Sequence, residues 1–187
     1  MIRARRPGRG LAAGLLALLP LAATAAANQD QLQLSNWLKY APAAGAAAYS
    51  AYRGDGSGLW QLGGEMAATI ASTQALKIAF KDGDWGTRPD GGSKSFPSGH
   101  VSTACAGAAY LGERYGWQAA APAYAVSAWT AWIRVNEDRH HVRDVVAGCA
   151  LAYGLSKLIV QPRLPADFAL LPVLGPGKIG LSLSANW

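Results

Sequence analysis

The chain has 187 residues, of which 51% are hydrophobic and 15% are charged, and its formal net charge is +6. Four of the positive charges lie among the first ten residues, as Arg3, Arg5, Arg6 and Arg9, and subtracting these four leaves +2 for the remaining sequence. This small residual charge argues against a nucleic-acid-binding domain, because such a domain keeps a basic patch when it is folded.

The amino-terminal segment has the pattern of an export signal. After the arginines, residues 11–27 are apolar and uncharged and end in Ala25-Ala26-Ala27, and small residues of this kind precede signal-peptide cleavage sites. We predict that residues 1–27 are a secretory signal peptide and that the mature chain acts at the periplasmic face of the bacterial cell envelope.

The remaining residues, 28–187, number about 160, which is enough for one domain with a core and too few for two. We predict a single all-α domain, a compact bundle of about five helices, because alanine is abundant along the chain and lets helices pack closely. The motif-bearing core spans about residues 59–160, and residues 161–187 form an irregular tail.

Five helical segments follow from periodicity and from turn signals. The first covers about residues 31–52, with an interruption expected before Pro42, and ends at the turn-forming run 53–58. The others cover about 59–80, 100–115, 121–135 and 144–160, with a break at Gly116 between the third and fourth. Proline and glycine punctuate the tail, and only residues 178–187 alternate weakly, like a strand.

Two loops concentrate the chemistry. The first, residues 81–100, holds Lys81, Arg88, Ser98, Gly99 and His100, and its last residues begin the third helix. Free backbone amides and the positive dipole end of a helix N-terminus attract an anion, so a phosphate is the expected ligand of this loop.

The second loop holds Arg134, His140 and Asp144, with the histidine and the aspartate one helical turn apart. If successive helices run antiparallel, both loops lie at the same end of the bundle. We therefore predict that they form one site.

The spacing of these residues resembles that of the type 2 phosphatidic acid phosphatase superfamily, which also includes bacterial acid phosphatases and vanadium haloperoxidases. A lysine, six residues and Arg-Pro stand here as Lys81 to Arg88, Pro-Ser-Gly-His ends at His100, and the third motif places Arg134, His140 and Asp144 in order. Ile133 stands where the third motif has serine. Three spaced motifs in register are far more specific than one.

The resemblance implies a phosphatase that needs no metal and no cofactor, acting on a phosphorylated lipid or a small phosphoester. We expect His140 to attack phosphorus and form a phosphohistidine, with Asp144 fixing its tautomer. We expect His100 to protonate the leaving oxygen. Since His140 must start neutral and His100 charged, the predicted pH dependence of kcat/KM is bell-shaped. The phosphate-binding residues are Lys81, Arg88, Ser98, Gly99 and Arg134.

Three alternatives stay open from the sequence. The same cradle can hold vanadate, which would make the chain a haloperoxidase, although its short length argues against this. A non-catalytic envelope protein that binds anionic lipid would keep the bundle without turnover. A zinc site from His100, His140 and His141 is disfavoured, because adjacent histidines on a helix project about 100° apart.

Other residues are candidates for supporting roles. Trp85 and His141 lie inside the two loops and are candidate specificity residues. Cys105 and Cys149 follow His100 and Asp144 by five residues each, so both lie about 7.5 Å below the catalytic end and could form a disulfide, with burial as two free thiols as the alternative.

Aromatic residues near the predicted helix ends, among them Trp37 and Trp60, suit a membrane interface, and core packing is the alternative. Charged residues within the helices argue against full membrane spans. We predict association with the membrane, with a soluble periplasmic bundle as the alternative.

Overall fold

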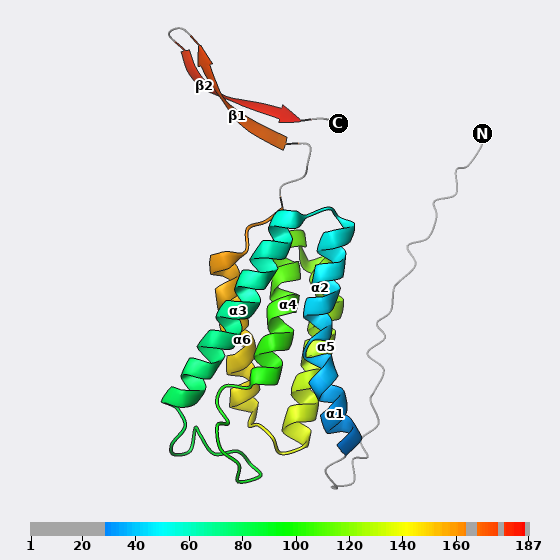
Figure 1. Ribbon diagram of the computed structural model, residues 1–187, viewed down its shortest axis with the longest axis vertical. Helices are drawn as coiled ribbons and strands as arrows, with labels where there is room; N and C mark the ends of the chain where they lie inside the picture. The colour runs from blue at the N-terminus through cyan, green and yellow to red at the C-terminus, as the bar shows by residue number, and fades with distance from the viewer. Residues whose placement is uncertain (1–28, 164–167, 176–177, 186–187) are drawn as a thin grey trace, which may run out of the picture.

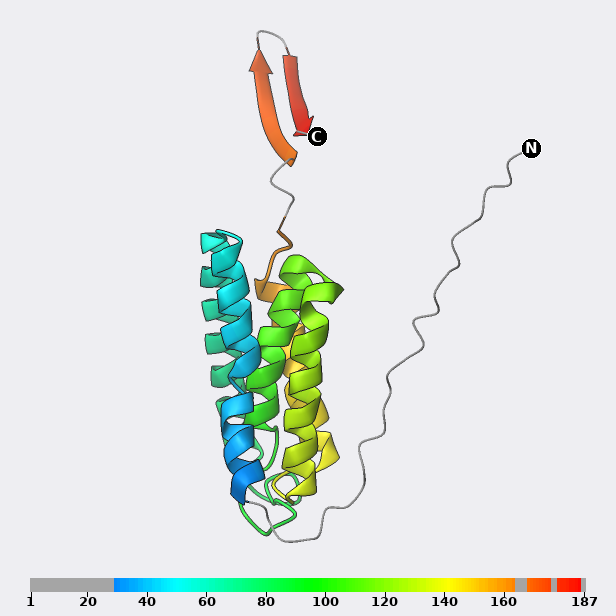
Figure 2. The same ribbon diagram turned by 90° about the vertical axis from the view of Figure 1, so that its right-hand side faces the viewer.

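The computed structural model describes residues 29–163 with their side chains, and residues 168–175 and 178–185 as backbone elements. The predicted signal peptide lies outside the described residues. Six helices and one hairpin of two strands make up the described structure (Figures 1 and 2). The helices are α1 Gln29–Leu38, α2 Ala41–Tyr52, α3 Gly56–Ala79, α4 Gly99–Tyr115, α5 Trp117–Asn136 and α6 Val142–Ile159.

Helix α4 is the central element of the bundle. It contacts all five other helices, and its residues 101–111 are all buried. Most of these residues are small, and α2 lies so close to α4 that a side chain at Gly107 would meet the Ala43 nitrogen at 2.4 Å. The small residues of α4 therefore allow the tight packing that the alanine content predicted.

Short connections fix the directions of the helices. A single residue, Gly116, joins α4 to α5 with φ at +94°, a conformation that side-chain-bearing residues rarely adopt. Helix α2 begins just after Lys39 and Tyr40, and Pro42 occupies its second position, where no helical N–H is needed. The chain thus turns without long loops, except at the catalytic end.

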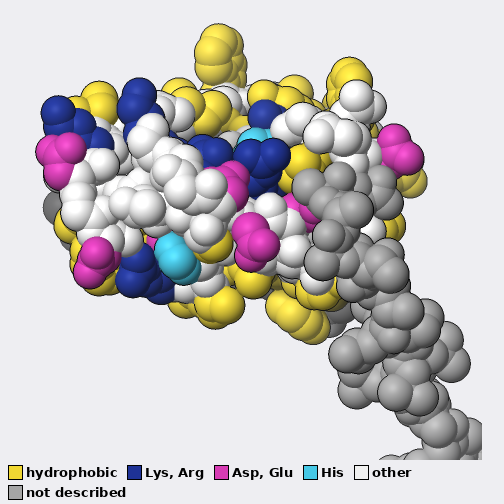
Figure 3. Space-filling view, turned by 90° about the horizontal axis from the view of Figure 1, so that it is seen from below, with side chains coloured by type: hydrophobic (Ala, Val, Ile, Leu, Met, Phe, Trp, Pro, Cys, Tyr) yellow, Lys and Arg dark blue, Asp and Glu magenta, His cyan; other side chains and the backbone are white. Residues whose placement is uncertain are grey.

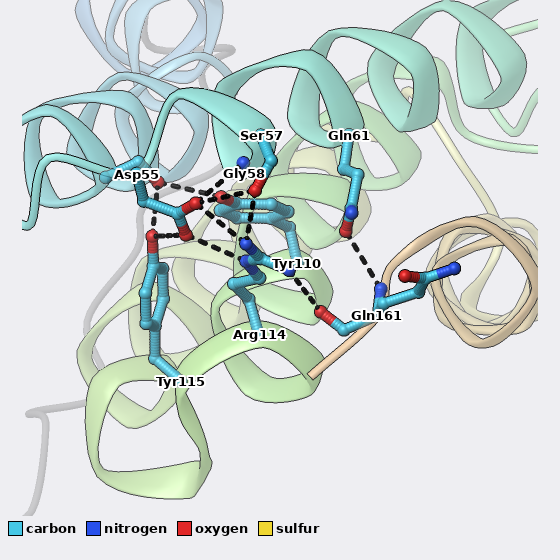
Figure 4. A network of polar contacts seen from close by, with 9 residues as sticks. Asp55, Ser57, Gly58, Gln61, Tyr110, Arg114, Tyr115 and Gln161 are labelled. Carbon is cyan, nitrogen blue, oxygen red and sulfur yellow. Dashed lines mark hydrogen bonds and ion pairs between the residues drawn. The ribbon is translucent and has the colours of Figure 1, made fainter. Parts of the chain in front are cut away.

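A buried ion pair secures the end of the bundle that lies opposite the catalytic loops (Figure 4). Asp55 caps α3 by accepting a hydrogen bond from the Gly58 amide at 2.9 Å. Its two carboxylate oxygens accept from Arg114 Nε at 2.8 Å and Nη2 at 2.7 Å. The Tyr115 hydroxyl donates to the same carboxylate, and Arg114 also donates to the Gln161 carbonyl. The network therefore ties together α3, α4 and the chain that leaves α6.

A disulfide joins Cys105 on α4 to Cys149 on α6. The structure thus contains the cross-link that the matching depths of the two cysteines suggested. It connects the two helices whose amino-terminal ends lie at His100 and close to His140.

The tail differs from the irregular segment that the sequence indicated. Strands β1 Phe168–Gly175 and β2 Lys178–Ala185 form an antiparallel hairpin, with Phe168 opposite Ala185 and Gly175 opposite Lys178. Proline and glycine obscured the first strand, because both residues are rare in strands. The weak alternation seen near the end of the chain corresponds to β2.

The all-α bundle is confirmed for the region that carries the motifs. The first expected helix is two helices, α1 and α2, because the chain is interrupted at Lys39 and Tyr40. Within the described part of the chain, no helix has both the length and the apolar character that crossing a bilayer requires.

Candidate active site

The two loops meet at one end of the bundle, as the antiparallel order of the helices predicted. The carboxyl ends of α3 and α5 and the amino ends of α4 and α6 all lie there (Figure 1). Figure 3 looks onto this end, where Lys and Arg side chains gather around a histidine near the centre of the face. The first loop is bonded to the second, since the Asp90 amide donates to the Asp138 carbonyl at 3.1 Å.

A pocket of about 310 Å³ opens at this end. His100, His140, Arg88, Arg134 and Gly99 all line it, so the structure brings together residues from all three motifs. The remaining lining residues come from the segment after α1, from α3 and from α4: Lys39, Tyr40, Ile70, Gln74, Lys77 and Thr103.

Lys77 and Lys39 line this pocket, whereas Lys81, the lysine of the first motif, does not. Lys77 is 9% exposed and donates hydrogen bonds from Nζ to the Lys94 carbonyl at 2.7 Å and the Ser95 carbonyl at 3.3 Å. The side chain of Lys81 is 60% exposed, and its ammonium lies 4.0 Å from Asp82. Helix α3 continues to Ala79, so its last inward-facing cation is Lys77, and Lys81 falls beyond the helix in solvent.

Four cationic side chains line the pocket, namely Lys39, Lys77, Arg88 and Arg134. Burial, together with the charges of Arg88 and Arg134, lowers the pKa of Lys77 to about 8, although the carboxylate of Asp144 opposes this effect. Burial and the neighbouring Arg88 lower the pKa of Arg134 to about 10. Within residues 29–163, the Nε atoms of both arginines are buried and have no hydrogen-bond partner. Such an excess of positive charge favours a bound anion.

His140 is buried at the base of the pocket, with Asp144 behind it. The Nδ1 atom of His140 lies 3.5 Å from Asp144 Oδ2, which is longer than an ordinary hydrogen bond. That oxygen accepts from Ser95 Oγ at 2.5 Å and from the His141 amide at 3.0 Å. The carboxylate is thus held in place, and catalytic hydrogen bonds often tighten only when the substrate is bound.

Burial and nearby cations disfavour the charged form of both histidines. Burial and the surrounding cations, Lys77 foremost, lower the pKa of His140 to about 2. Burial and the same kind of charges, led by Arg134 and Lys39, lower the pKa of His100 to about 3. The prediction that His140 starts neutral agrees with these values. The lowered pKa of His100 opposes the charged starting state that the sequence led us to expect, because the sequence did not reveal how many cations face this residue.

The amino end of α4 approaches the first turn of α6 closely. The Ser98 amide donates to the Asp144 carbonyl at 2.9 Å, and a side chain at Gly148 would meet the Ser98 carbonyl oxygen at 2.7 Å. In the described residues, the buried Oγ of Ser98 has no partner. Gly99 lines the pocket, so the helix N-terminus is directed at the same space as the cations.

The two candidate specificity residues lie outside the pocket lining. Trp85 packs edge-to-face on Phe96, with ring centroids 4.8 Å apart, and the Arg143 guanidinium lies 4.8 Å from the centre of its ring. Nε2 of His141 is 3.2 Å from the Thr87 carbonyl. Both residues therefore hold the first loop against α6. A substrate role for either stays a prediction.

No metal cluster is evident in the described chain, since nowhere in it do three His, Cys, Asp or Glu side chains gather suitably. Ile133, which replaces the serine of the third motif, is fully buried in α5.

The family model of the PAP2 superfamily matches residues 58–164 of the chain. The chain belongs to this superfamily, as its three motifs indicated, and it is a phosphatase. A relative, the lipid A 4'-phosphatase of Helicobacter pylori (strain J99 / ATCC 700824), is 30% identical over 141 residues, covering 66% of this chain and 71% of the relative. No solved structure matches the chain.

Proposed function

We propose that this chain releases inorganic phosphate from a phosphorylated lipid through a phosphohistidine on His140. The observation that carries the proposal is the pocket itself, which is lined by His100 and His140 together with the cations Lys39, Lys77, Arg88 and Arg134. A phosphoryl group carries close to two negative charges near neutral pH. Fixed cations remove the repulsion that a nucleophile would otherwise meet.

The reaction has two steps. In the first, a ring nitrogen of His140 forms a bond to phosphorus while the bond between phosphorus and the ester oxygen breaks, and His100 gives that oxygen a proton. In the second, water attacks phosphorus, His100 takes its proton, and His140 leaves as a neutral imidazole. The negative charge of the bound phosphate opposes the cations that lower the pKa of His100, so His100 gains a proton more readily once the substrate is bound.

A lipid substrate is supported by three observations. The relative from Helicobacter pylori is named for a lipid phosphate, lipid A. The pocket volume exceeds what a phosphoryl group fills, and Tyr40, Ile70 and Gln74 line the space that is left for the alcohol. Large apolar side chains are exposed around the catalytic end, namely Trp37, Tyr40, Ile78, Phe80, Trp85 and Trp132. Such a rim suits contact with a membrane surface.

We therefore infer that the enzyme works at the periplasmic face of the envelope, with the catalytic end against lipid. A phosphate monoester of lipid A is the first candidate substrate, and phosphatidate-like lipids and isoprenoid diphosphates come next.

The test is phosphate release by the purified mature chain from lipid A, phosphatidate, farnesyl diphosphate and 4-nitrophenyl phosphate. We expect turnover that His140→Ala abolishes. When the reaction with a ³²P-labelled substrate is quenched without acid, the label should remain attached to the protein. This label should be absent in His140→Ala and present in His141→Ala. Retention of label in His140→Ala would assign the nucleophile to another residue. Vanadate-dependent halide oxidation without phosphate release would favour a haloperoxidase.

A further inference from the structure

The amino-terminal helix α1 contacts residues that line the candidate pocket, although it lies outside residues 58–164, where the superfamily matches. It packs on α5 and touches α4. Arg134 Nη1 donates to Ser35 Oγ at 3.4 Å, and Lys39, just after the helix, lines the pocket. These contacts place one face of α1 beside His100.

The side chain of Asn36 makes the closest of these contacts. Its Oδ1 atom lies 2.7 Å from Nε2 of His100. An amide oxygen only accepts hydrogen bonds, so this contact favours the tautomer of the neutral ring that carries its hydrogen on Nε2. This leaves Nδ1 of His100 as the nitrogen that exchanges a proton with the substrate.

We propose that Asn36 is a positioning residue, which holds the imidazole of His100 in the orientation and tautomer that proton transfer to the leaving group requires. The inference rests on the proposed function, in which His100 is the general acid. An amide suits this task because it orients the ring without adding a negative charge to a pocket that must bind an anion.

Leaving-group dependence separates positioning from a merely structural role. An alkyl phosphate needs its leaving oxygen protonated, whereas 4-nitrophenolate leaves without help. General acid catalysis contributes about 10²–10⁴ in rate, and a misoriented acid should lose part of it. We expect Asn36→Ala to lower kcat/KM for an alkyl phosphate by about 10- to 100-fold, and to change it less than about threefold for 4-nitrophenyl phosphate.

The matched control is Gln33→Ala, which truncates an exposed amide one turn earlier on the same helix. It should leave both rates unchanged. Asn36 is itself exposed, so its truncation leaves no cavity. Equal losses for both substrates in Asn36→Ala, or no loss for either, would overturn the proposal.

Asn36→Asp provides a second readout. The cations and the second imidazole around His100 stay in place in this variant: Lys39, Lys77, Arg88, Arg134 and His140. A carboxylate at position 36 favours the imidazolium form against them. We expect the alkyl-phosphate rate to recover partly and the alkaline limit of kcat, which reports the enzyme–substrate complex, to move to higher pH. An unmoved limit would contradict contact between the two side chains in solution.

Ring ¹⁵N chemical shifts test the same contact without any turnover. In the wild-type protein at pH 7, the resonances of His100, assigned with a His100→Gln variant, should report hydrogen on Nε2. In Asn36→Ala they should report a mixture of tautomers. A wild-type ring that carries its hydrogen on Nδ1 would overturn the proposal, whereas wild-type protein with this signature but no phosphatase activity would overturn only the proposed function.

Discussion

The position of the pocket lysine gives the sharpest prediction, because the sequence motif points to Lys81 and the structure points to Lys77. Replacing Lys77 with methionine removes one of the four cationic side chains that line the pocket proposed to bind the phosphoryl group. Removing one such stabilising donor costs about 10²–10³ in kcat. We expect Lys77→Met to lower kcat/KM by a similar factor and Lys81→Met to leave it within about twofold.

The same substitution should stabilise the fold. A lysine pKa lowered from 10.5 to about 8 by burial corresponds to about 3 kcal/mol of unfavourable free energy. About 1 kcal/mol of this gain is lost, because the Lys94 and Ser95 carbonyls no longer have the ammonium as a donor. The net expectation is a gain of about 2 kcal/mol in the free energy of unfolding.

The sign of the pH dependence follows from the lowered pKa. Folding disfavours the charged amine, so the destabilisation is fully present below pH 8 and disappears as the pH rises toward 10.5. Phosphate release at pH 6 and urea unfolding at pH 6 and pH 10 measure both effects. An inactive Lys81→Met together with an active Lys77→Met would refute the reasoning, as would a loss of stability in Lys77→Met.

Three further predictions concern pH and the buried charges. Burial raises the pKa of Glu65 to about 8, so the wild-type free energy of unfolding should fall by about 1.4 kcal/mol per pH unit from pH 4.5 to 8, and urea titrations of Glu65→Gln should lack this slope. Asp55→Asn leaves the buried guanidinium of Arg114 without its counter-charge and should lower the free energy of unfolding, measured with urea, by about 3–5 kcal/mol. A decrease of less than about 1 kcal/mol would show that the ion pair is solvated. Because burial and nearby cations disfavour the charged forms of His100 and His140, the substrate monoanion should supply the first proton. The fall of kcat/KM above about pH 6 should therefore move with the second pKa of the substrate, and a limit fixed near 6.5 for all substrates would contradict this.

Most of the catalytic cluster could be predicted from spacing. His140 and Asp144 lie four residues apart around the start of α6, and the antiparallel order of the helices brings them to His100, Arg88 and Arg134. These relations depend only on helix geometry and chain direction, which composition and periodicity largely determine. The predicted meeting of the two loops at one end of the bundle is unaffected by the division of the first expected helix into α1 and α2.

The sequence also contains a signal for Lys77, although it is weaker than the motif spacing that pointed to Lys81. Polar residues recur every four positions along α3, as Glu65, Thr69, Thr73 and Lys77, and all four are buried. This stripe marks the inward face of the helix and distinguishes Lys77 from Lys81. The contact of Asn36 with His100 had no such signal, because nothing in the sequence fixes how α1 lies against α4.

The cross-link between Cys105 and Cys149 has a consequence for where the enzyme can work. It restrains α4 from sliding along α6, and the amino-terminal turns of those helices carry His100, the proposed general acid, and Asp144, the proposed support of the nucleophile. The relative position of His100 and His140 therefore depends on a disulfide, and disulfides are reduced in thiol-rich compartments. In the reducing cytoplasm the chain would keep all the proposed catalytic side chains but would lack the disulfide that fixes α4 against α6.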